Sequence, residues 1–145
     1  MFLLVAAPCA FAGPDERAIK ETAKRTGYSV SEVREHYSGC GSGITPWMNL
    51  CAEYNFIASD LKLNDLYGSV KKNVKGTSAE ERLIQAQRAW LKFRDLTCKY
   101  ESEGYAGGTG RAGIELSCMQ RQTEARIKDF EAYLQCTEPG RPGEW

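Results

Sequence analysis

Six cysteines and a single histidine are the side chains of this 145-residue chain that are best suited to chemistry. Cysteine thiolates bind zinc or attack substrates, and histidine acts beside them as a second ligand or a general base. No Cys-x-x-Cys pair occurs, and His36 has no Ser or Cys motif near it. We therefore expect no metal, no other cofactor and no catalytic residue, and we interpret His36 as a solvated surface side chain.

Acidic side chains also occur in pairs, and two carboxylates are a common arrangement for general acid–base catalysis. The pairs are Asp60 with Asp65 and Glu80 with Glu81. Both pairs fit solvated helix faces and helix caps better than a catalytic site. The sequence thus predicts a non-enzymatic protein, with an unrecognised enzyme as the weaker alternative.

Residues 1–12 indicate where the protein acts. An apolar run followed by Ala-Phe-Ala before Gly13 is typical of a secretory signal peptide, although the usual positively charged start is missing. We expect cleavage after Ala12. A lipid anchor at Cys9 is the alternative, but Pro8 fits such a site poorly. Export favours disulfides, so we expect a periplasmic or secreted protein with no stable membrane anchor.

Five cysteines lie after this segment, which leaves one without a partner inside the chain. Cys98 and Cys118 flank a glycine-rich loop between two helices that we expect to be antiparallel, so we predict a disulfide between them. Cys51 has two possible partners, Cys40 across a short spacer and Cys136 at the far end of the last helix. The short spacer favours Cys40, and Cys136 then becomes the odd cysteine.

The apolar periodicity predicts an all-α protein. We expect a disulfide-stapled antiparallel bundle of three main helices, preceded by a short N-terminal helical hairpin. The first main helix begins at Thr45 and ends at Gly76, the second ends near Glu103, and the third begins near Ala112. Thr77 and Ser78, with Glu80 and Glu81 three residues on, predict capping boxes for the second helix.

The chain divides into a signal peptide (1–12), an N-terminal helical extension (13–38), a helical domain (39–137) and a disordered tail (138–145). In the extension, Asp15 opens a first helix, Gly27 ends it, and Ser29 with Glu32 forms a capping box for a second. Residues 21–34 resemble the helix-turn-helix of MerR-type regulators. Nineteen basic and nineteen acidic residues leave no electrostatic surplus for DNA, so we expect no nucleic-acid partner.

The middle helix of the bundle carries an apolar stripe that we predict to be buried, namely Leu83, Ala86, Trp90, Phe93 and Thr97. Gln87 and Arg94 lie one turn before and one turn after Trp90. We interpret Gln87 as bonding a neighbouring helix, and Arg94 as extending along the core toward a carboxylate. A ligand site at these two side chains is the alternative.

Several short motifs occur in order along these helices: Met48-Asn49-x-Cys51-Ala52, Leu63-Asn64-x-x-Tyr67, Gln87-Arg88-Ala89-Trp90-x-x-Phe93-Arg94-Asp95-x-x-Cys98, Gly107-Gly108, Cys118 and Thr123-x-x-Arg126. Together they resemble the secreted lysozyme-inhibitor LprI-like domain of bacteria over about residues 40–136. The resemblance implies a small, disulfide-stapled, all-helical module that inhibits lysozyme. It also implies a structural motif made of Asn49, Asn64, Tyr67, Gln87, Trp90, Arg94, Asp95, Thr123 and Arg126.

The glycine-rich loop is the candidate binding site if the activity follows the resemblance. Tyr105 would be an aromatic anchor, Arg111 a cation that meets the carboxylates of a target cleft, and Gly107 and Gly108 the turn between them. A tight turn without a binding role is the alternative. We therefore expect an exported binding protein that inhibits lysozyme or a related peptidoglycan-cleaving enzyme. Alternatively, it is a cell-envelope interaction module for another protein, such as a toxin.

Overall fold

A computed structural model describes residues 13–135. Within this range the protein is all-α and contains no strand. Its elements are α1 (Glu16–Thr26), α2 (Val30–His36), the 3₁₀ turn η1 (Gly39–Gly41), α3 (Thr45–Asn73), α4 (Ser78–Ser102), the 3₁₀ turn η2 (Glu103–Tyr105) and α5 (Arg111–Gln135). The predicted fold class is confirmed. The expected signal peptide, the odd Cys136 and the expected tail fall outside the described residues.

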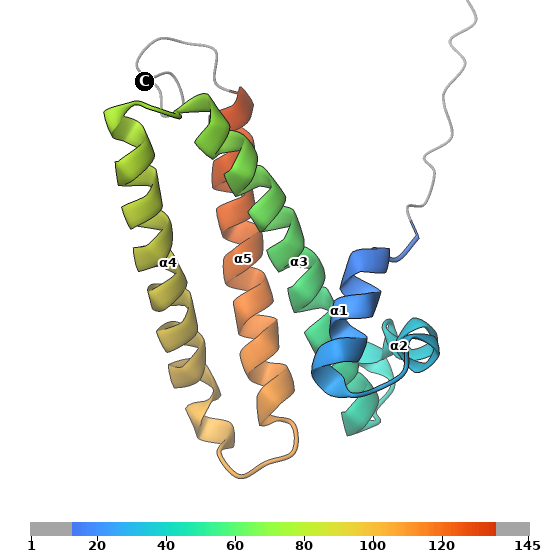
Figure 1. Cartoon of the computed structure of the whole chain (residues 1–145). Coiled ribbons are helices and arrows are strands. Elements are labelled where there is room, and N and C mark those ends of the chain that lie inside the picture. The colour runs from blue at the N-terminus through green and yellow to red at the C-terminus, as the bar shows by residue number, and fades with distance from the viewer. Residues whose placement is uncertain (1–12, 136–145) are drawn as a thin grey trace, which may run out of the picture.

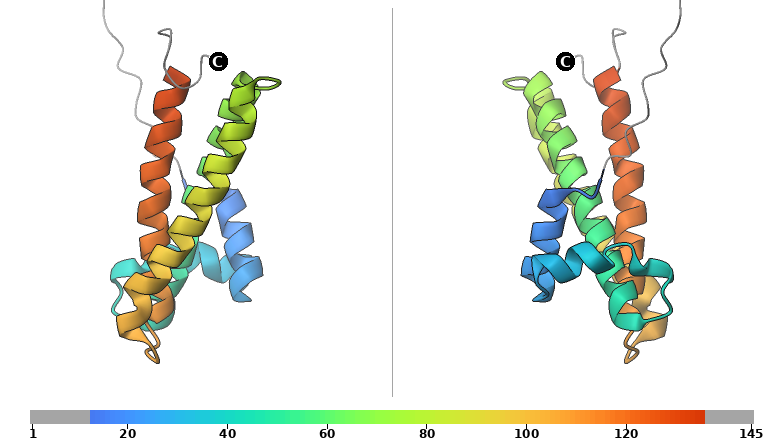
Figure 2. Two further views of the ribbon diagram at one scale, coloured as in Figure 1. Left: turned by 90° about the vertical axis from the view of Figure 1, so that its left-hand side faces the viewer. Right: turned by 90° about the vertical axis from the view of Figure 1, so that its right-hand side faces the viewer.

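Helix α4 runs antiparallel to α3 and to α5, so α3 and α5 run in the same direction (Figure 1). The most extensive contact is between α3 and α5, and α4 packs mainly on α5, so α4 forms one edge of the bundle. Helices α1 and α2 lie beside the N-terminal half of α3, on the side away from α4 (Figures 1 and 2). The loop between α4 and α5 is at the same end of the bundle as the start of α3.

The N-terminal hairpin forms through the predicted caps. The side chain of Asp15 accepts hydrogen bonds from the first-turn amides of α1, and Gly27 ends that helix with a φ of 79°. This left-handed conformation favours glycine because it has no Cβ. The Ser29 hydroxyl accepts from the Glu32 amide, and the Glu32 carboxylate accepts from the Ser29 amide. This is the reciprocal capping box expected from the sequence.

The predicted capping of α4 is wrong. The Thr77 hydroxyl donates to the carbonyl of Val74 and makes no cap bond to α4, while the Glu80 carboxylate accepts from the amide of Gly76. Helix α3 ends at Asn73, three residues before the predicted position. In this tight turn the two side chains form hydrogen bonds with backbone groups of the α3–α4 connection, and not with the free amides at the start of α4.

Two apolar clusters stabilise the bundle. The first joins α1 and α2 to α3 and consists of Ala18, Ile19, Val33, Leu50, Tyr54, Phe56 and Ile57. The second joins α3 to α5 and consists of Leu63, Val70, Ile127 and Phe130. The hydroxyl of Tyr54 also accepts a 2.9 Å hydrogen bond from the amide of Asp15. The N-terminal extension therefore shares its core with α3.

The predicted buried stripe of α4 is wrong at two of its five positions, while Leu83, Trp90 and Thr97 are half-buried. Phe93 is 57% exposed and Ala86 is exposed, whereas Gln87, Arg94 and Cys98 are buried. Apolar residues occupy two faces of α4, and the polar motif together with the disulfide selects the face that meets α5. Periodicity alone identifies an apolar stripe without stating which helix, if any, will cover it.

Candidate functional site at the loop end

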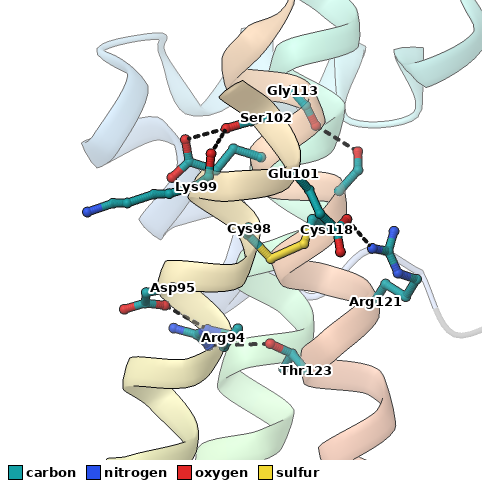
Figure 3. The surroundings of a disulfide bond; sticks show 12 residues. Arg94, Asp95, Cys98, Lys99, Glu101, Ser102, Gly113, Cys118, Arg121 and Thr123 are labelled. Carbon is teal, nitrogen blue, oxygen red and sulfur yellow. Dashed lines mark hydrogen bonds and ion pairs between the residues drawn. A yellow bond between two sulfur atoms is a disulfide. The ribbon is translucent and has the colours of Figure 1, made fainter. Parts of the chain in front are cut away.

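Two disulfides fix the end of the bundle that carries the glycine-rich loop. Cys98 of α4 is bonded to Cys118 of α5, with Cα atoms 5.5 Å apart (Figure 3). Cys40 in η1 is bonded to Cys51 of α3, with Cα atoms 5.2 Å apart. The structure thus contains both preferred pairings, and Cys51 is bonded to Cys40 rather than to Cys136.

The start of α3 holds the loop from its other side. The side-chain amide of Asn49 donates a 2.9 Å hydrogen bond to the carbonyl of Thr109. Gly113, in the first turn of α5, leaves room for this contact, because a Cβ there would lie 2.6 Å from Oδ1 of Asn49. One motif residue therefore positions the loop against α3, and a glycine that the sequence analysis did not single out permits the close approach.

The loop itself contains a tight turn and an exposed tip. The amide of Gly108 donates to the carbonyl of Tyr105 at 3.0 Å, and Gly107 has a φ of 80°. Tyr105 is 55% exposed. The guanidinium of Arg111 forms a 2.7 Å ion pair with the carboxylate of Glu103, so this cation already has a partner within the loop.

A cavity of about 480 Å³ opens between the loop and the first turns of α3 and α5. This volume falls in the range of small-molecule and side-chain binding sites. It is lined by Cys40, Thr45, Met48, Asn49, Ala52, Tyr105, Ala106, Gly108, Gly110, Arg111, Gly113, Ile114 and Ser117. Three of its lining side chains, Met48, Tyr105 and Ile114, are large, apolar and exposed.

We refer to Met48, Tyr105 and Ile114 as the loop-end surface. Of these three, sequence reasoning names only Tyr105 as a candidate binding residue, since Met48 enters it only as part of a motif and Ile114 does not enter it. Met48 lies in the first turn of α3 and Ile114 in the first turn of α5. These positions, close to the loop, are the feature of the sequence that could have identified them. Such an exposed apolar group is typical of a protein interaction site when a polar rim surrounds it.

A buried guanidinium joins the three main helices elsewhere in the bundle. Arg94 of α4 lies 3.0 Å from the carboxylate of Asp60 in α3, 2.9 Å from that of Asp95, and 3.3 Å from the hydroxyl of Thr123 in α5. Figure 3 shows the contacts with Asp95 and Thr123 below the disulfide. The side chain of Asn64 donates to the same Asp60 at 3.3 Å. These contacts favour the structural interpretation of Arg94.

Gln87 and Trp90 belong to a second group of helix contacts. Arg126 of α5 donates to the Gln87 side chain at 3.2 Å and pairs with Asp129. Two guanidinium groups lie near the Trp90 ring, that of Arg94 at 5.2 Å and that of Arg126 at 5.9 Å from its centroid. Tyr67, also in the predicted motif, lies 6.0 Å from the ring of Phe130. The motif side chains connect helices, as expected for a structural role.

His36 is not the solvated side chain that the sequence suggested. It is half-buried, and its ring stacks on that of Trp47 with centroids 3.8 Å apart. Nowhere in residues 13–135 do three His, Cys, Asp or Glu side chains gather closely enough to hold a metal ion.

Glu53 has an unusual electrostatic environment. Burial raises the pKa of this carboxyl above its ordinary value, and Arg25 at 3.8 Å opposes the increase. Glu53 lines a second cavity of about 540 Å³, which shares Thr45 and Asn49 with the first. Glu53 is the one carboxyl group among the residues that line this cavity, beside the hydroxyl-bearing side chains of Thr26, Thr45 and Thr109.

The fold and the loop-end surface together define a small, disulfide-linked helical bundle with an exposed apolar end. Residues 40–130 match the model of the lysozyme inhibitor LprI family, and the chain belongs to that family. The predicted resemblance is confirmed. An uncharacterized protein of Rhizobium meliloti (strain 1021) is 26% identical over 103 residues, which cover 63% of this chain and 74% of that protein. No solved structure was found to match the chain significantly.

Proposed function

We propose that this protein is an exported, non-enzymatic inhibitor of lysozyme or of a related peptidoglycan-cleaving enzyme. The observation that carries the proposal is the loop-end surface, an exposed apolar group beside a fixed loop in a member of a family described as lysozyme inhibitors. Export is supported by the two disulfides, which persist in oxidising compartments. Within residues 13–135, no helix combines the length and the hydropathy needed to cross a membrane.

Lysozymes cleave their substrate in a groove that contains two carboxyl groups. Inhibition requires that this groove be filled or covered, and a loop tip is a suitable shape for that purpose. The tip around Tyr105 is held by the Cys98–Cys118 disulfide and by the bond from Asn49 to Thr109. Because the tip is already ordered, little conformational entropy is lost when it enters a groove.

Tyr105 is the central contact in this proposal, and Arg111 has a lesser role. A buried aromatic anchor commonly accounts for about 2 kcal/mol or more of binding energy. Arg111 is paired with the exposed carboxylate of Glu103, so it approaches a target as part of a neutral pair. We therefore expect added salt to weaken the complex only slightly, mainly through the association rate.

The alternative function is that of a cell-envelope interaction module that binds another protein, such as a toxin, without inhibiting lysozyme. The same loop-end surface supports it, since an exposed apolar group fits more than one kind of protein partner. The charge balance favours this alternative, because nineteen basic and nineteen acidic residues provide little long-range attraction toward a strongly charged enzyme.

The test is a titration of the purified protein against lysozymes of several classes, with activity and direct binding measured in parallel. Tyr105→Ala should weaken inhibition by about 30-fold, the equivalent of 2 kcal/mol. Tyr100→Ala is the matched control, since it removes an 82% exposed tyrosine from α4 and should leave inhibition unchanged. Both variants should keep the melting temperature of the wild type.

A second pair of variants tests the contribution of Arg111 to binding. Arg111→Ala should weaken inhibition less than Tyr105→Ala, and Arg121→Ala, which removes a comparable exposed ion pair with Glu101, should have no effect. If the wild type inhibits and both loop variants inhibit equally well, the binding surface lies elsewhere. If the wild type inhibits none of the enzymes, the envelope-module alternative replaces the inhibitor proposal.

A further inference from the structure

The outer face of α4 carries an exposed apolar row that no part of the described chain covers. Its members are Ala86, Ala89, Phe93, Leu96 and Tyr100, all of them exposed. We call them the α4 seam. Their spacing alternates between three and four residues, which is the pattern of positions a and d in two-helix coiled-coil packing. The row extends for about 21 Å along the helix at 1.5 Å per residue.

This exposure follows from the way α4 is attached to the bundle. The helix meets α5 through Gln87, Arg94 and Cys98, which lie on a different face from the α4 seam. Phe93 is 57% exposed, Leu96 56% and Tyr100 82%. Helix α4 forms the edge of the bundle, and no other described helix lies over its outer side (Figure 2).

Basic side chains follow the α4 seam along one side. Lys92 and Lys99 are seven residues apart, both at position g of the heptad that places Phe93 and Tyr100 at a, and Arg88 lies one turn before Lys92. All three are exposed, and none forms an ion pair with another described residue. By contrast, Arg94 and Arg121 are paired with carboxylates across the helix interfaces. The unpaired row can therefore accept acidic side chains.

We propose that the α4 seam docks a helix of another protein. That helix would carry apolar residues at the same alternating spacing and a row of Asp or Glu side chains facing Lys92 and Lys99. The seam provides the apolar contact, and charge pairs at the flanking positions select the partner and its orientation. This surface is separate from the loop-end surface, so the proposal does not depend on lysozyme inhibition.

A second copy of this chain does not have the required chemistry. In an antiparallel pair, position g faces position g, so Lys92 and Lys99 would face lysines of the other copy. In a parallel pair they would face position e, where Trp90 and Thr97 offer no carboxylate. A lipid surface also fits less well, because a helix in the membrane interface needs a broader apolar face than a narrow a/d row.

The test uses two synthetic helical peptides as probes. Both have leucine at every a and d position over three heptads, and the flanking positions are glutamate in one and lysine in the other. Fluorescence anisotropy at low salt should show at least about tenfold tighter binding of the acidic peptide to the purified protein. The double variant Lys92→Glu, Lys99→Glu should instead bind the lysine peptide more tightly. A nonspecific apolar contact would show no such reversal.

Phe93→Ala with Leu96→Ala should abolish peptide binding, while Val30→Ala, which trims an exposed apolar residue of α2, should not. Thermal melts of these variants check that the fold is intact, and lysozyme inhibition should be unchanged in all of them. Equal affinity for the two peptides would overturn the proposal. So would sedimentation equilibrium showing a dimer that Phe93→Ala dissociates. Binding of the wild type to phosphatidylglycerol vesicles, without binding to either peptide, would also overturn it.

Discussion

The guanidinium of Arg94 lies 3.0 Å from the carboxylate of Asp60, which joins two helices that otherwise make little direct contact. The Arg94 side chain is 7% exposed and also reaches Thr123 on α5, so one charged group connects all three main helices. A buried charge is tolerated only where hydrogen bonds and an opposite charge compensate for its lost hydration. The polar motif around Arg94 supplies these partners.

Arg94→Ala should therefore lower the free energy of unfolding by about 3–5 kcal/mol, because it leaves the Asp60 carboxylate without its buried cation. Arg121→Ala is the control and should cost no more than about 1 kcal/mol, since its pair with Glu101 is exposed. Urea denaturation of both variants and the wild type measures the difference. Equal losses of unfolding free energy in the two variants would show that burial does not strengthen the ion pair of Arg94.

Replacement of Cys98 and Cys118 by serine should lower the free energy of unfolding by about 2–5 kcal/mol, the usual cost of losing a native disulfide from a small exported domain. Peptide mapping without reductant should find this bond, and that between Cys40 and Cys51, in protein isolated from an oxidising compartment. Recovery of Cys98 as a free thiol, or bonded to another cysteine, would contradict the pairing.

Trp90→Ala and Phe93→Ala should differ strongly, although the two residues are neighbours on α4. Trp90 packs against the α3–α5 cluster and contacts two guanidinium groups, so its loss should cost about 3 kcal/mol. Phe93 is 57% exposed, and its loss should change the free energy of unfolding by less than about 0.5 kcal/mol. Denaturant titrations of both variants check this. A large cost at Phe93 would mean that the α4 seam is covered.

Glu53→Gln should stabilise the protein at neutral pH. Burial raises the pKa of Glu53, so the folded state binds this proton more tightly than the unfolded state does. The resulting stability is present below the ordinary pKa of about 4.3 and is lost as the pH rises through the raised pKa. Glutamine removes the ionisation, so the variant should melt at a higher temperature at pH 7 and at a similar temperature at pH 3.

Glu21→Gln is the matched control for Glu53, because both carboxylates contact Arg25. The hydrogen bond from Arg25 lowers the pKa of Glu21, so its stabilising effect is present above the ordinary pKa and is lost as the pH falls. This variant should be destabilised at pH 7, the opposite sign to Glu53→Gln. The same sign for both variants would show that burial does not control the pKa of Glu53.

Gly113→Ala should loosen the glycine-rich loop. The added methyl group would lie 2.6 Å from Oδ1 of Asn49, so Asn49 must move away and release the carbonyl of Thr109. Amide hydrogen exchange in residues 105–110 should become faster. Gly110→Ala is the control, because a Cβ at that position meets no atom within 4 Å. Equal exchange in the two variants would show that Asn49 does not hold the loop.

The sequence by itself determined the helical class, the hairpin caps at Asp15 and Ser29, and the family. Each of these depends on residues close together in the chain, or on a set of short motifs in a fixed order. Capping, for example, is decided within a few residues by which side chain reaches a free backbone amide. The structural interpretation of Arg94 was also accessible from sequence, because a charged residue within an apolar helix face needs a buried partner.

Only the tertiary structure decided that Ala86 and Phe93 of α4 are exposed, and which groups form the loop-end surface. The apolar residues of α4 fit two faces equally well, and the choice depends on groups far along the chain, Thr123, Arg126 and Cys118 on α5. The same holds for Met48 and Ile114, which meet at one cavity only because two helices start at the same end of the bundle. Contacts between distant segments depend on packing, which local periodicity does not encode.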